Sequence, residues 1–160
     1  MAIPLHLWLT DQRGAAIRGS SQVKGREGSI EILSFSHGMR IPTDGNTGKL
    51  TGGRCHEPMI IEKEIDRSSP ILYMTIARGL TLSRVEIKWY RISESGEKEE
   101  YFNMLMTNVK VVSAGPRVQN IKDEAATTLN HLETVELRYE QISWKYLDGN
   151  LIFSEAWNMY

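Results

Sequence analysis

The stretch DRSSPILYMTIARG, residues 66–79, predicts a helix over residues 69–78 with a signal at each end. Ser68 or Ser69 can accept hydrogen bonds from the first free N–H groups, and Pro70 fits a first turn that needs no N–H. Gly79 suits the left-handed conformation that ends a helix. Because the other periodic segments read as strands, we expect one helix in a β-rich chain.

The predicted helix has almost no polar face. Between Pro70 and Arg78 only Thr75 is clearly polar, and a helix that is apolar on all sides has to be covered on all sides. A small β domain offers it a single face, so a second chain would cover the rest. In the alternative, Leu72, Ile76 and Leu80 pack on the same domain and leave Tyr73 and Met74 partly exposed.

Outside this helix, apolar and polar residues alternate at period two, which predicts half-buried strands. The inward sets are Ile3, Leu5, Leu7 and Leu9; Ile30 and Ile32; Met59, Ile61 and Ile65; Val85, Ile87 and Trp89. Two further segments, 101–106 and 109–111, continue to a predicted break at Gly115-Pro116, and turns are expected at Ser95-Gly96 and Asp148-Gly149. Residues 119–129 are polar and poorly periodic, which predicts a surface loop.

The last long strand changes phase partway. Val135, Leu137 and Tyr139 are odd-numbered, whereas Ile142 and Trp144 are even-numbered, so a bulge or sharp bend is expected near Glu140-Gln141. Such bends let a strand pass between sheets or curve around a barrel. We therefore predict a mainly β fold: a closed or nearly closed antiparallel two-sheet barrel or sandwich with one flanking helix.

Composition narrows the function classes. The 160 residues are expected to form a single domain over 1–160, and 19 basic against 20 acidic residues give a net charge of −1. This balance disfavours nucleic acid or an anionic membrane as a partner. A single Cys55 excludes an internal disulfide and fits a reducing compartment. The first eleven residues lack the features of a secretory signal, and no apolar run approaches membrane-spanning length.

No motif predicts an enzyme, a metal or a cofactor. Residues 45–51, GNTGKLT, lack the glycine that a phosphate-binding loop needs at Thr43 and the hydroxyl it needs at Leu50. Cys55 and His56 are neighbours in an extended segment and so point to opposite sides, which disfavours a thiol–imidazole pair. The four histidines show no metal-ligand spacing and are expected to be isolated loop or surface groups.

Two segments remain as candidates for contacts. The long loop from His37 to Glu57 contains five glycines and Pro42, and loops of this length in a small domain are usually functional or disordered. Ser34 and Ser36 are small polar residues on the phase opposite Leu33 and Phe35. Ordinary solvent exposure explains them, and so does a wet cavity between subunits.

Several motifs occur in order along the chain: GSIEILSFSHG at 28–38, TGK at 47–49, HEP at 56–58, KEID at 63–66 before SSP at 68–70, YF at 101–102 and ETVELRYEQISW at 133–144. Together they resemble the haemolysin co-regulated protein (Hcp) family, the tube protein of the type VI secretion system. The resemblance covers essentially the whole chain and implies no C-terminal effector extension.

The resemblance implies a β-barrel subunit that closes into homohexameric rings, which stack head-to-tail into a tube. It also implies partners: sheath proteins around the tube, a VgrG-type spike protein at the tip, and small effector proteins in the lumen, with cytoplasmic synthesis and secretion without a signal peptide. Candidate ring-stacking residues are His37, Arg40, Pro42, Asp44, Asn46, Lys49, Arg54, Cys55, His56 and Glu57. Candidate lateral-interface residues are Pro70, Tyr73, Met74 and Ala77, and candidate lumen residues are Ser34 and Ser36.

Two other classes of function stay open. A contractile-phage tail-tube protein shares the general architecture and would be distinguished by the neighbouring genes. A monomeric barrel that binds a small molecule, or that depends on Cys55 as an enzyme, would remain a monomer in solution and would lose activity on Cys55→Ala.

Overall fold

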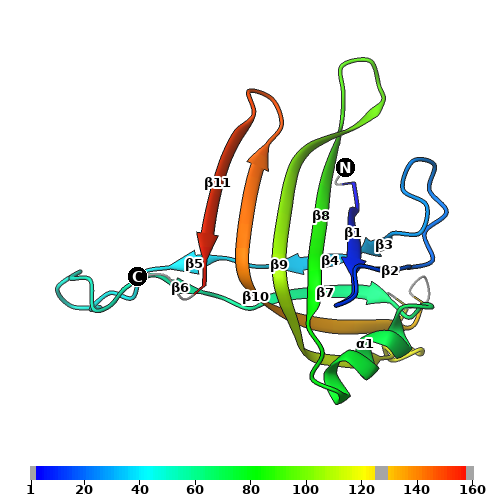
Figure 1. Cartoon of the computed structure of the whole chain (residues 1–160), viewed down its shortest axis with the longest axis horizontal. Helices are drawn as coiled ribbons and strands as arrows, with labels where there is room; N and C mark the ends of the chain where they lie inside the picture. The colour runs from blue at the N-terminus through cyan, green and yellow to red at the C-terminus, as the bar shows by residue number, and fades with distance from the viewer. Residues whose placement is uncertain (1–2, 125–129, 158–160) are drawn as a thin grey trace.

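The computed structural model describes residues 3–124 and 130–157, and within these ranges it contains eleven strands and one helix (Figure 1). The strands are β1 Leu5–Thr10, β2 Ala16–Ile17, β3 Ile30–Ile32, β4 Ser34–Ser36, β5 Met39–Arg40, β6 Cys55–His56, β7 Met59–Glu64, β8 Leu82–Ile92, β9 Lys98–Arg117, β10 Leu132–Tyr146 and β11 Leu151–Ala156. The helix α1 spans Ser69–Ala77. All strand pairs are antiparallel, so the mainly β fold with one helix is confirmed.

The main sheet is bent into a nearly closed barrel by a strand that changes partner. The sheet runs β2-β1-β8-β9-β10-β7-β4, while β3 pairs with β1. Only Leu33 separates β3 from β4, and its N–H donates to the Glu62 carbonyl at 2.8 Å. Residues 30–36 therefore link the two ends of the sheet, which matches the predicted opposite phases of Ile30 and Phe35.

Two hairpins and one extended segment project from this barrel (Figure 1). The β8–β9 and β10–β11 hairpins rise side by side through the pairing of β9 with β10, and residues 37–57 extend sideways. The predicted turns are present, since Gly96 has φ +85° and Gly149 has φ +84° in the two hairpin connections. Side-chain packing between the strands fills the barrel with residues such as Leu7, Ile87 and Met106.

The predicted irregularities were partly right. Glu140 and Gln141 are both exposed while Tyr139 and Ile142 are buried, so the change of phase in β10 is confirmed. Opposite this point Asn108 has φ +52°, and its Nδ2 donates to Glu140 Oε2 at 3.0 Å. The register shift between β9 and β10 lies between Glu136 and Leu137 instead, so a bulge at Glu140-Gln141 is wrong. The predicted break at Gly115-Pro116 is wrong, because β9 continues to Arg117. Among the described residues β8 pairs with β9 only as far as Val109, so this edge of β9 has no strand partner near Pro116, and a proline is tolerated there.

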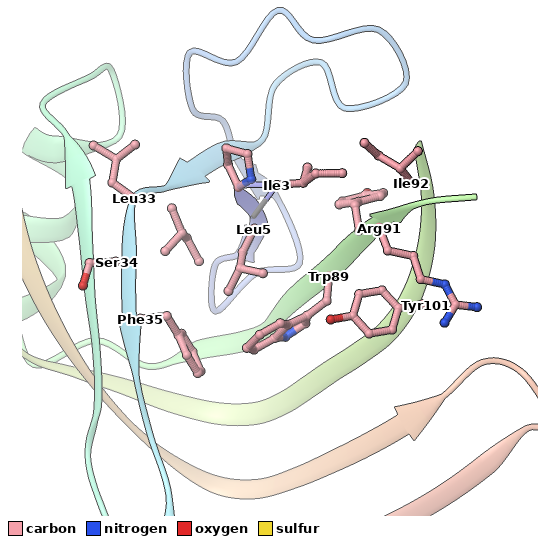
Figure 2. A pocket seen from close by; sticks show the side chains of 12 residues that line it. Ile3, Leu5, Leu33, Ser34, Phe35, Trp89, Arg91, Ile92 and Tyr101 are labelled. Carbon is pink, nitrogen blue, oxygen red and sulfur yellow. The ribbon is translucent and has the colours of Figure 1, made fainter. Parts of the chain in front are cut away.

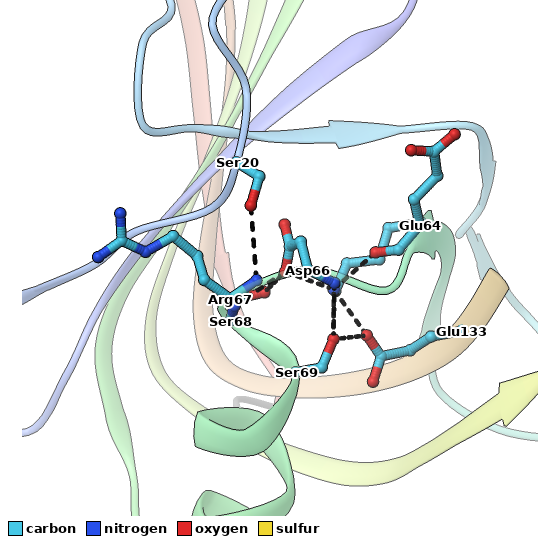
Figure 3. A network of polar contacts seen from close by, with 8 residues as sticks. Ser20, Glu64, Asp66, Arg67, Ser68, Ser69 and Glu133 are labelled. Carbon is cyan, nitrogen blue, oxygen red and sulfur yellow. Dashed lines mark hydrogen bonds and ion pairs between the residues drawn. The ribbon is translucent and has the colours of Figure 1, made fainter. Parts of the chain in front are cut away.

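The phase of β7 places a lysine in the core. Met59 and Ile61 are buried as predicted, but Ile65 is 44% exposed and Lys63 is fully buried. Lys63 Nζ lies 2.6 Å from Glu133 Oε2 and 3.1 Å from Asp66 Oδ1, and Ser69 Oγ donates to Glu133 Oε2 at 2.7 Å (Figure 3). A buried ammonium needs such partners, because an unpaired charge away from water is very costly.

The helix begins at the predicted serine, but the hydrogen bonds at its start differ from the prediction. Ser68 occupies the N-cap position without a side-chain cap hydrogen bond. Its hydroxyl donates instead to Asp66 Oδ1 at 2.5 Å, so the predicted serine cap is wrong. Pro70 in the first turn and Gly79 at φ +61° are confirmed.

The faces of the helix are also unexpected. Ser69, Leu72 and Thr75 are buried, whereas Met74 and Ala77 are exposed. Thr75 tolerates burial because its hydroxyl donates to the Ile71 carbonyl at 2.8 Å. The helix therefore packs on the barrel through one narrow face and presents apolar side chains outward.

In the predicted surface loop 119–129, residues 120–124 are exposed. Residues 125–129 lie outside the described ranges.

Candidate assembly interface

Residues 37–57, called the arm below, form an ordered hairpin rather than an irregular loop. Met39 and Arg40 pair with His56 and Cys55, and a further bridge joins Thr43 to Leu50. At its tip, the Asp44 carboxylate accepts hydrogen bonds from the N–H groups of Asn46 at 2.7 Å and Thr47 at 3.1 Å. The order of the arm means that it can present fixed side chains to another molecule.

Aromatic contacts hold the base of the arm on β10. His37 Nε2 lies 2.9 Å and His56 Nδ1 lies 2.5 Å from the hydroxyl of Tyr139. The His56 ring stacks on Trp157 with a centroid separation of 5.2 Å. His56 and Tyr139 are buried, and His37 is half-buried. The prediction of isolated loop or surface histidines is therefore wrong for His37 and His56.

The prediction of isolated loop or surface histidines is also wrong for His6, which lies in the barrel. It is buried, and its Nδ1 lies 2.8 Å from Ser29 Oγ.

The surroundings shift the acidity of this cluster. Burial lowers the pKa of His37, His56 lowers it further, and Glu57 opposes the change. Burial lowers the pKa of His56 most, and the positive Arg54 lowers it further. Glu155 acts in the opposite direction and raises it. Burial raises the pKa of Tyr139 above its ordinary value, so the phenol keeps its proton and remains a hydrogen-bond donor.

Ion pairs add to the attachment of the arm. Arg54 pairs with Glu155 and also donates through Nη2 to the Ala156 carbonyl at 2.8 Å. Arg40 and Glu57 pair across the arm at 3.6 Å, although both are exposed and such pairs contribute little.

The ten predicted stacking residues thus fall into two groups. The side chains of His37, Arg40, Arg54, His56 and Glu57 make contacts at the base of the arm. Asp44, Asn46, Lys49 and Cys55 are exposed and Pro42 is half-exposed. Cys55 and His56 face opposite sides, as predicted. Beside the polar tip lie two exposed apolar residues, Ile41 and Leu50, the latter 67% exposed.

A second exposed apolar surface lies on β11, and sequence reasoning missed it. Within the described residues β11 pairs only with β10, so its other edge has unpaired backbone groups. Leu151, Ile152 and Phe153 are 66%, 57% and 56% exposed. Edge strands with exposed apolar side chains pair readily with other chains unless they are covered. Three consecutive apolar residues after the Asp148-Gly149 turn were the available signal.

The predicted lateral residues of α1 are not equivalent. Pro70, Met74 and Ala77 are exposed, and they form an apolar outward face. Tyr73 is half-buried, and burial together with the nearby Glu133 carboxylate raises its pKa to about 12. Tyr73 therefore belongs partly to the buried network around Lys63.

The predicted lumen residues Ser34 and Ser36 are both exposed on β4. Between them Phe35 packs against the core. Ser34 also lines a pocket of about 660 Å³ at one end of the barrel. Figure 2 shows this pocket between Leu5, Leu33 and Phe35 on one side and Trp89, Tyr101 and Ile92 on the other, so its lining is mainly apolar and aromatic.

Among residues 3–124 and 130–157, no group of three or more His, Cys, Asp and Glu side chains is placed to hold a metal ion. In the same ranges no helix has the length and apolar character needed to span a bilayer.

These features define a class of protein: a β-barrel domain with an ordered arm, an exposed apolar edge strand and an exposed apolar helix face. The family model described as "Type VI secretion system effector, Hcp" matches residues 6–146. The chain therefore belongs to the Hcp family of the type VI secretion system, and the resemblance seen in the sequence is confirmed.

Individual relatives agree with this assignment. The "Major exported protein" of Pseudomonas aeruginosa is 30% identical over 166 residues, covering 98% of this chain and 96% of the relative. The structure of Hcp1 from Escherichia coli EAEC 042 is 52% identical with a TM-score of 0.88, covering 98% of this chain and 99% of that one. The secreted Hcp3 of P. aeruginosa is 24% identical with a TM-score of 0.79, covering 98% and 99%, and supports the fold alone.

Proposed function

We propose that this chain is the structural subunit of the inner tube of a type VI secretion system. In this role it forms homohexameric rings that stack head-to-tail, are propelled by a contractile sheath, and carry small effectors in the lumen. The observation that carries the proposal is the combination of an ordered projecting arm with the exposed apolar edge of β11. A monomer would leave both surfaces in water, where they are prone to uncontrolled association.

The two surfaces suit two different contacts. The edge of β11 and the apolar face of α1 supply area for lateral contacts that close a ring. The arm projects away from the barrel and suits a head-to-tail contact with the next ring, which an open stack requires. The polar tip residues Asp44, Asn46 and Lys49 fit the rim of such a contact, with Ile41 and Leu50 as its apolar part.

The proposed role is mechanical and needs no catalytic residue or cofactor. Its partners are further copies of the chain, the sheath, a VgrG-type spike protein and the effectors. The name of the P. aeruginosa relative, "Major exported protein", supports export of this chain, which we propose starts in the bacterial cytoplasm.

Exposed Ser34 and Ser36 on β4 are the proposed lumen residues. A small hydroxyl keeps a surface wet without holding cargo tightly. We expect Ser36→Arg to reduce the amount of effector that co-purifies with the protein while the rings remain intact. Loss of the rings would place β4 in a subunit contact instead.

The experiment that tests the proposal is the solution mass of the purified protein, measured by light scattering behind a sizing column. A particle of six 18.2 kDa chains supports ring assembly. A monomer across micromolar concentrations contradicts it and favours a barrel that binds a small molecule, for which the pocket beside Trp89 would be the first candidate. Neighbouring genes for capsid proteins would favour a phage tail tube.

Cys55→Ala separates the proposed role from a thiol-dependent enzyme. Cys55 is exposed, and its one hydrogen bond to the described residues is weak, from Sγ to the Gly53 carbonyl at 3.8 Å. We therefore expect the free energy of unfolding to change by less than about 0.5 kcal/mol and the mass of the particle to stay the same.

A further inference from the structure

Two imidazoles share one phenol hydroxyl at the base of the arm. His37 Nε2 and His56 Nδ1 lie 2.9 Å and 2.5 Å from Tyr139 Oη. The hydroxyl has one proton, so it can donate to one ring and accept from the other. All three groups are therefore hydrogen-bonded to one another when both rings are neutral and present complementary tautomers.

This arrangement accepts one further proton but not two. When His37 is protonated, its Nε2–H donates to the hydroxyl and the hydroxyl donates to His56 Nδ1. When His56 is protonated as well, both rings donate to the same oxygen, and the phenol proton has no acceptor within the cluster. Two positive rings then lie beside one hydroxyl in a mostly buried site, where like charges repel more strongly than in water.

The second ring nitrogen of His56 makes the second protonation of the cluster still less favourable. Its Nε2 is buried and has no hydrogen-bond partner among the described residues. In an imidazolium both nitrogens carry protons, so a protonated His56 would bury an unpaired charged N–H group.

The charges around the cluster do not favour the second proton. Arg54 on the arm repels a positive His56, and the nearest carboxylate on β11, Glu155, is already paired with Arg54. Glu57 favours a positive His37 but pairs with Arg40 at 3.6 Å. From β10, the Arg138 guanidinium lies 5.3 Å from the centre of the Trp157 ring, on which His56 stacks.

We propose that His37, Tyr139 and His56 form an acid-sensitive switch, which holds the base of the arm on the barrel while at most one imidazole is protonated and releases it when both are. The release is a property of a single chain. Its consequence rests on the proposed function: a released arm would weaken the contact between stacked rings and leave the rings themselves intact.

The direction of the pH effect follows from proton counts. Burial lowers the pKa of both histidines in the attached arm, whereas the rings of a released arm titrate near the ordinary value of about 6.5. The attached state thus binds fewer protons than the released one. Its stability is fully present above about pH 6.5 and is lost progressively as the pH falls below that value.

The test uses a spin label on Cys55, the single cysteine of the chain, whose side chain is exposed on β6 next to His56. The mobility of the label is measured by electron paramagnetic resonance from pH 8 to pH 5. We compare the otherwise unchanged protein with His37→Gln, His56→Gln and the control His131→Gln, which replaces an exposed histidine outside the arm.

We expect the unchanged protein and the His131→Gln control to pass from an immobile to a mobile label, with a midpoint below about pH 6.5. Either arm variant should keep the label immobile to pH 5, because glutamine can hydrogen-bond to Tyr139 and cannot take up the second proton. The near-ultraviolet circular dichroism of each variant at pH 8 checks that it is folded, and one folded arm variant is enough for the comparison.

Two results would overturn the switch: an unchanged protein whose label stays immobile at pH 5, or an arm variant that releases its label at the same pH as the control. The solution mass of the same samples separates this proposal from the proposed function. A monomer whose label is released by acid contradicts the tube subunit and supports the switch. A six-chain particle whose label stays immobile at acid pH supports the tube subunit and contradicts the switch.

Discussion

Lys63 and Glu133 form an ion pair with no exposure to solvent, at 2.6 Å. Removing one partner leaves the other as an uncompensated buried charge, so we expect Lys63→Met to lower the free energy of unfolding by about 3–5 kcal/mol. The double variant Lys63→Met, Glu133→Leu should recover most of this loss, because it removes both fully buried charges, and the Asp66 carboxylate, which is 11% exposed, keeps its hydrogen bonds from Ser68. Urea unfolding measures both, and a double variant no more stable than the single one would contradict the argument.

His6 gives the barrel a pH dependence of its own. Burial, followed by Arg26 and Lys98, lowers its pKa to about 4, against about 6.5 in the unfolded chain. The folded state therefore binds fewer protons, and its stability is lost as the pH falls from about 6.5 toward 4, by up to about 3 kcal/mol. We expect His6→Asn to flatten the dependence of urea stability on pH in this range.

The matched control for His6 is His131→Asn, which replaces an exposed histidine. It should keep the slope of the unchanged protein. Equal slopes in both variants would show that some other group carries the pH dependence.

The residues of these clusters were hard to predict because their partners are far away in the sequence. His56 and Tyr139 are 83 positions apart, and Ser69 and Glu133 are 64 apart. Periodicity tells which way a side chain points, and it correctly predicted that Met59 and Ile61 face inward. The same prediction passed over Lys63, which is buried, and was wrong for Ile65, which is exposed. The acidic partner Asp66 lies only three positions away, but nothing local indicated that a lysine at 63 would also pair with Glu133.

The elements were more predictable, because each depends on local chemistry. The helix start at Ser69, the Asp148-Gly149 turn and the change of phase at Glu140 follow from neighbouring residues. The arm appeared only as a long glycine-rich loop, since the groups that order it, Tyr139 and Glu155, lie on other strands. The break placed at Gly115-Pro116 failed because it ignored that this edge of β9 has no strand partner there among the described residues.

At the scale of elements, β11 provides the sharpest test of ring closure. We expect Leu151→Lys to leave the monomer folded, because this side chain is 66% exposed, and to reduce the six-chain particle to smaller species. A charge placed at the centre of an apolar contact costs about 2 kcal/mol or more at each interface, and a ring repeats that cost. Light scattering gives the mass, and thermal unfolding shows that the fold is kept.

The control for Leu151→Lys is Ile121→Lys. It introduces the same charge at a residue that is 77% exposed and lies outside both hairpins. It should keep the six-chain mass. If Leu151→Lys keeps that mass as well, β11 is not the lateral contact, and the outward face of α1 becomes the next element to change.

At the scale of the whole molecule, the separate attachment of the arm predicts that ring formation and stacking can be uncoupled. Arg40 pairs with Cys55 across the arm, so residues 41–54 can be replaced by Asn-Gly, a two-residue turn that suits such a hairpin. The shortened chain keeps His37, His56 and the whole barrel, including β11 and α1. Its six-chain mass in light scattering should therefore be unchanged.

Without the arm, however, the rings lose the surface proposed to reach the next ring. Electron microscopy of concentrated protein should then show single rings where the unchanged chain forms stacks. Gly45→Ala is the matched control, because a Cβ at this position of the arm meets no atom within 4 Å, and it should stack normally. Stacks that survive removal of the arm would assign the head-to-tail contact to the barrel itself. A shortened chain that runs as a monomer would instead place the arm in the lateral contact, because closing the ring would then depend on it.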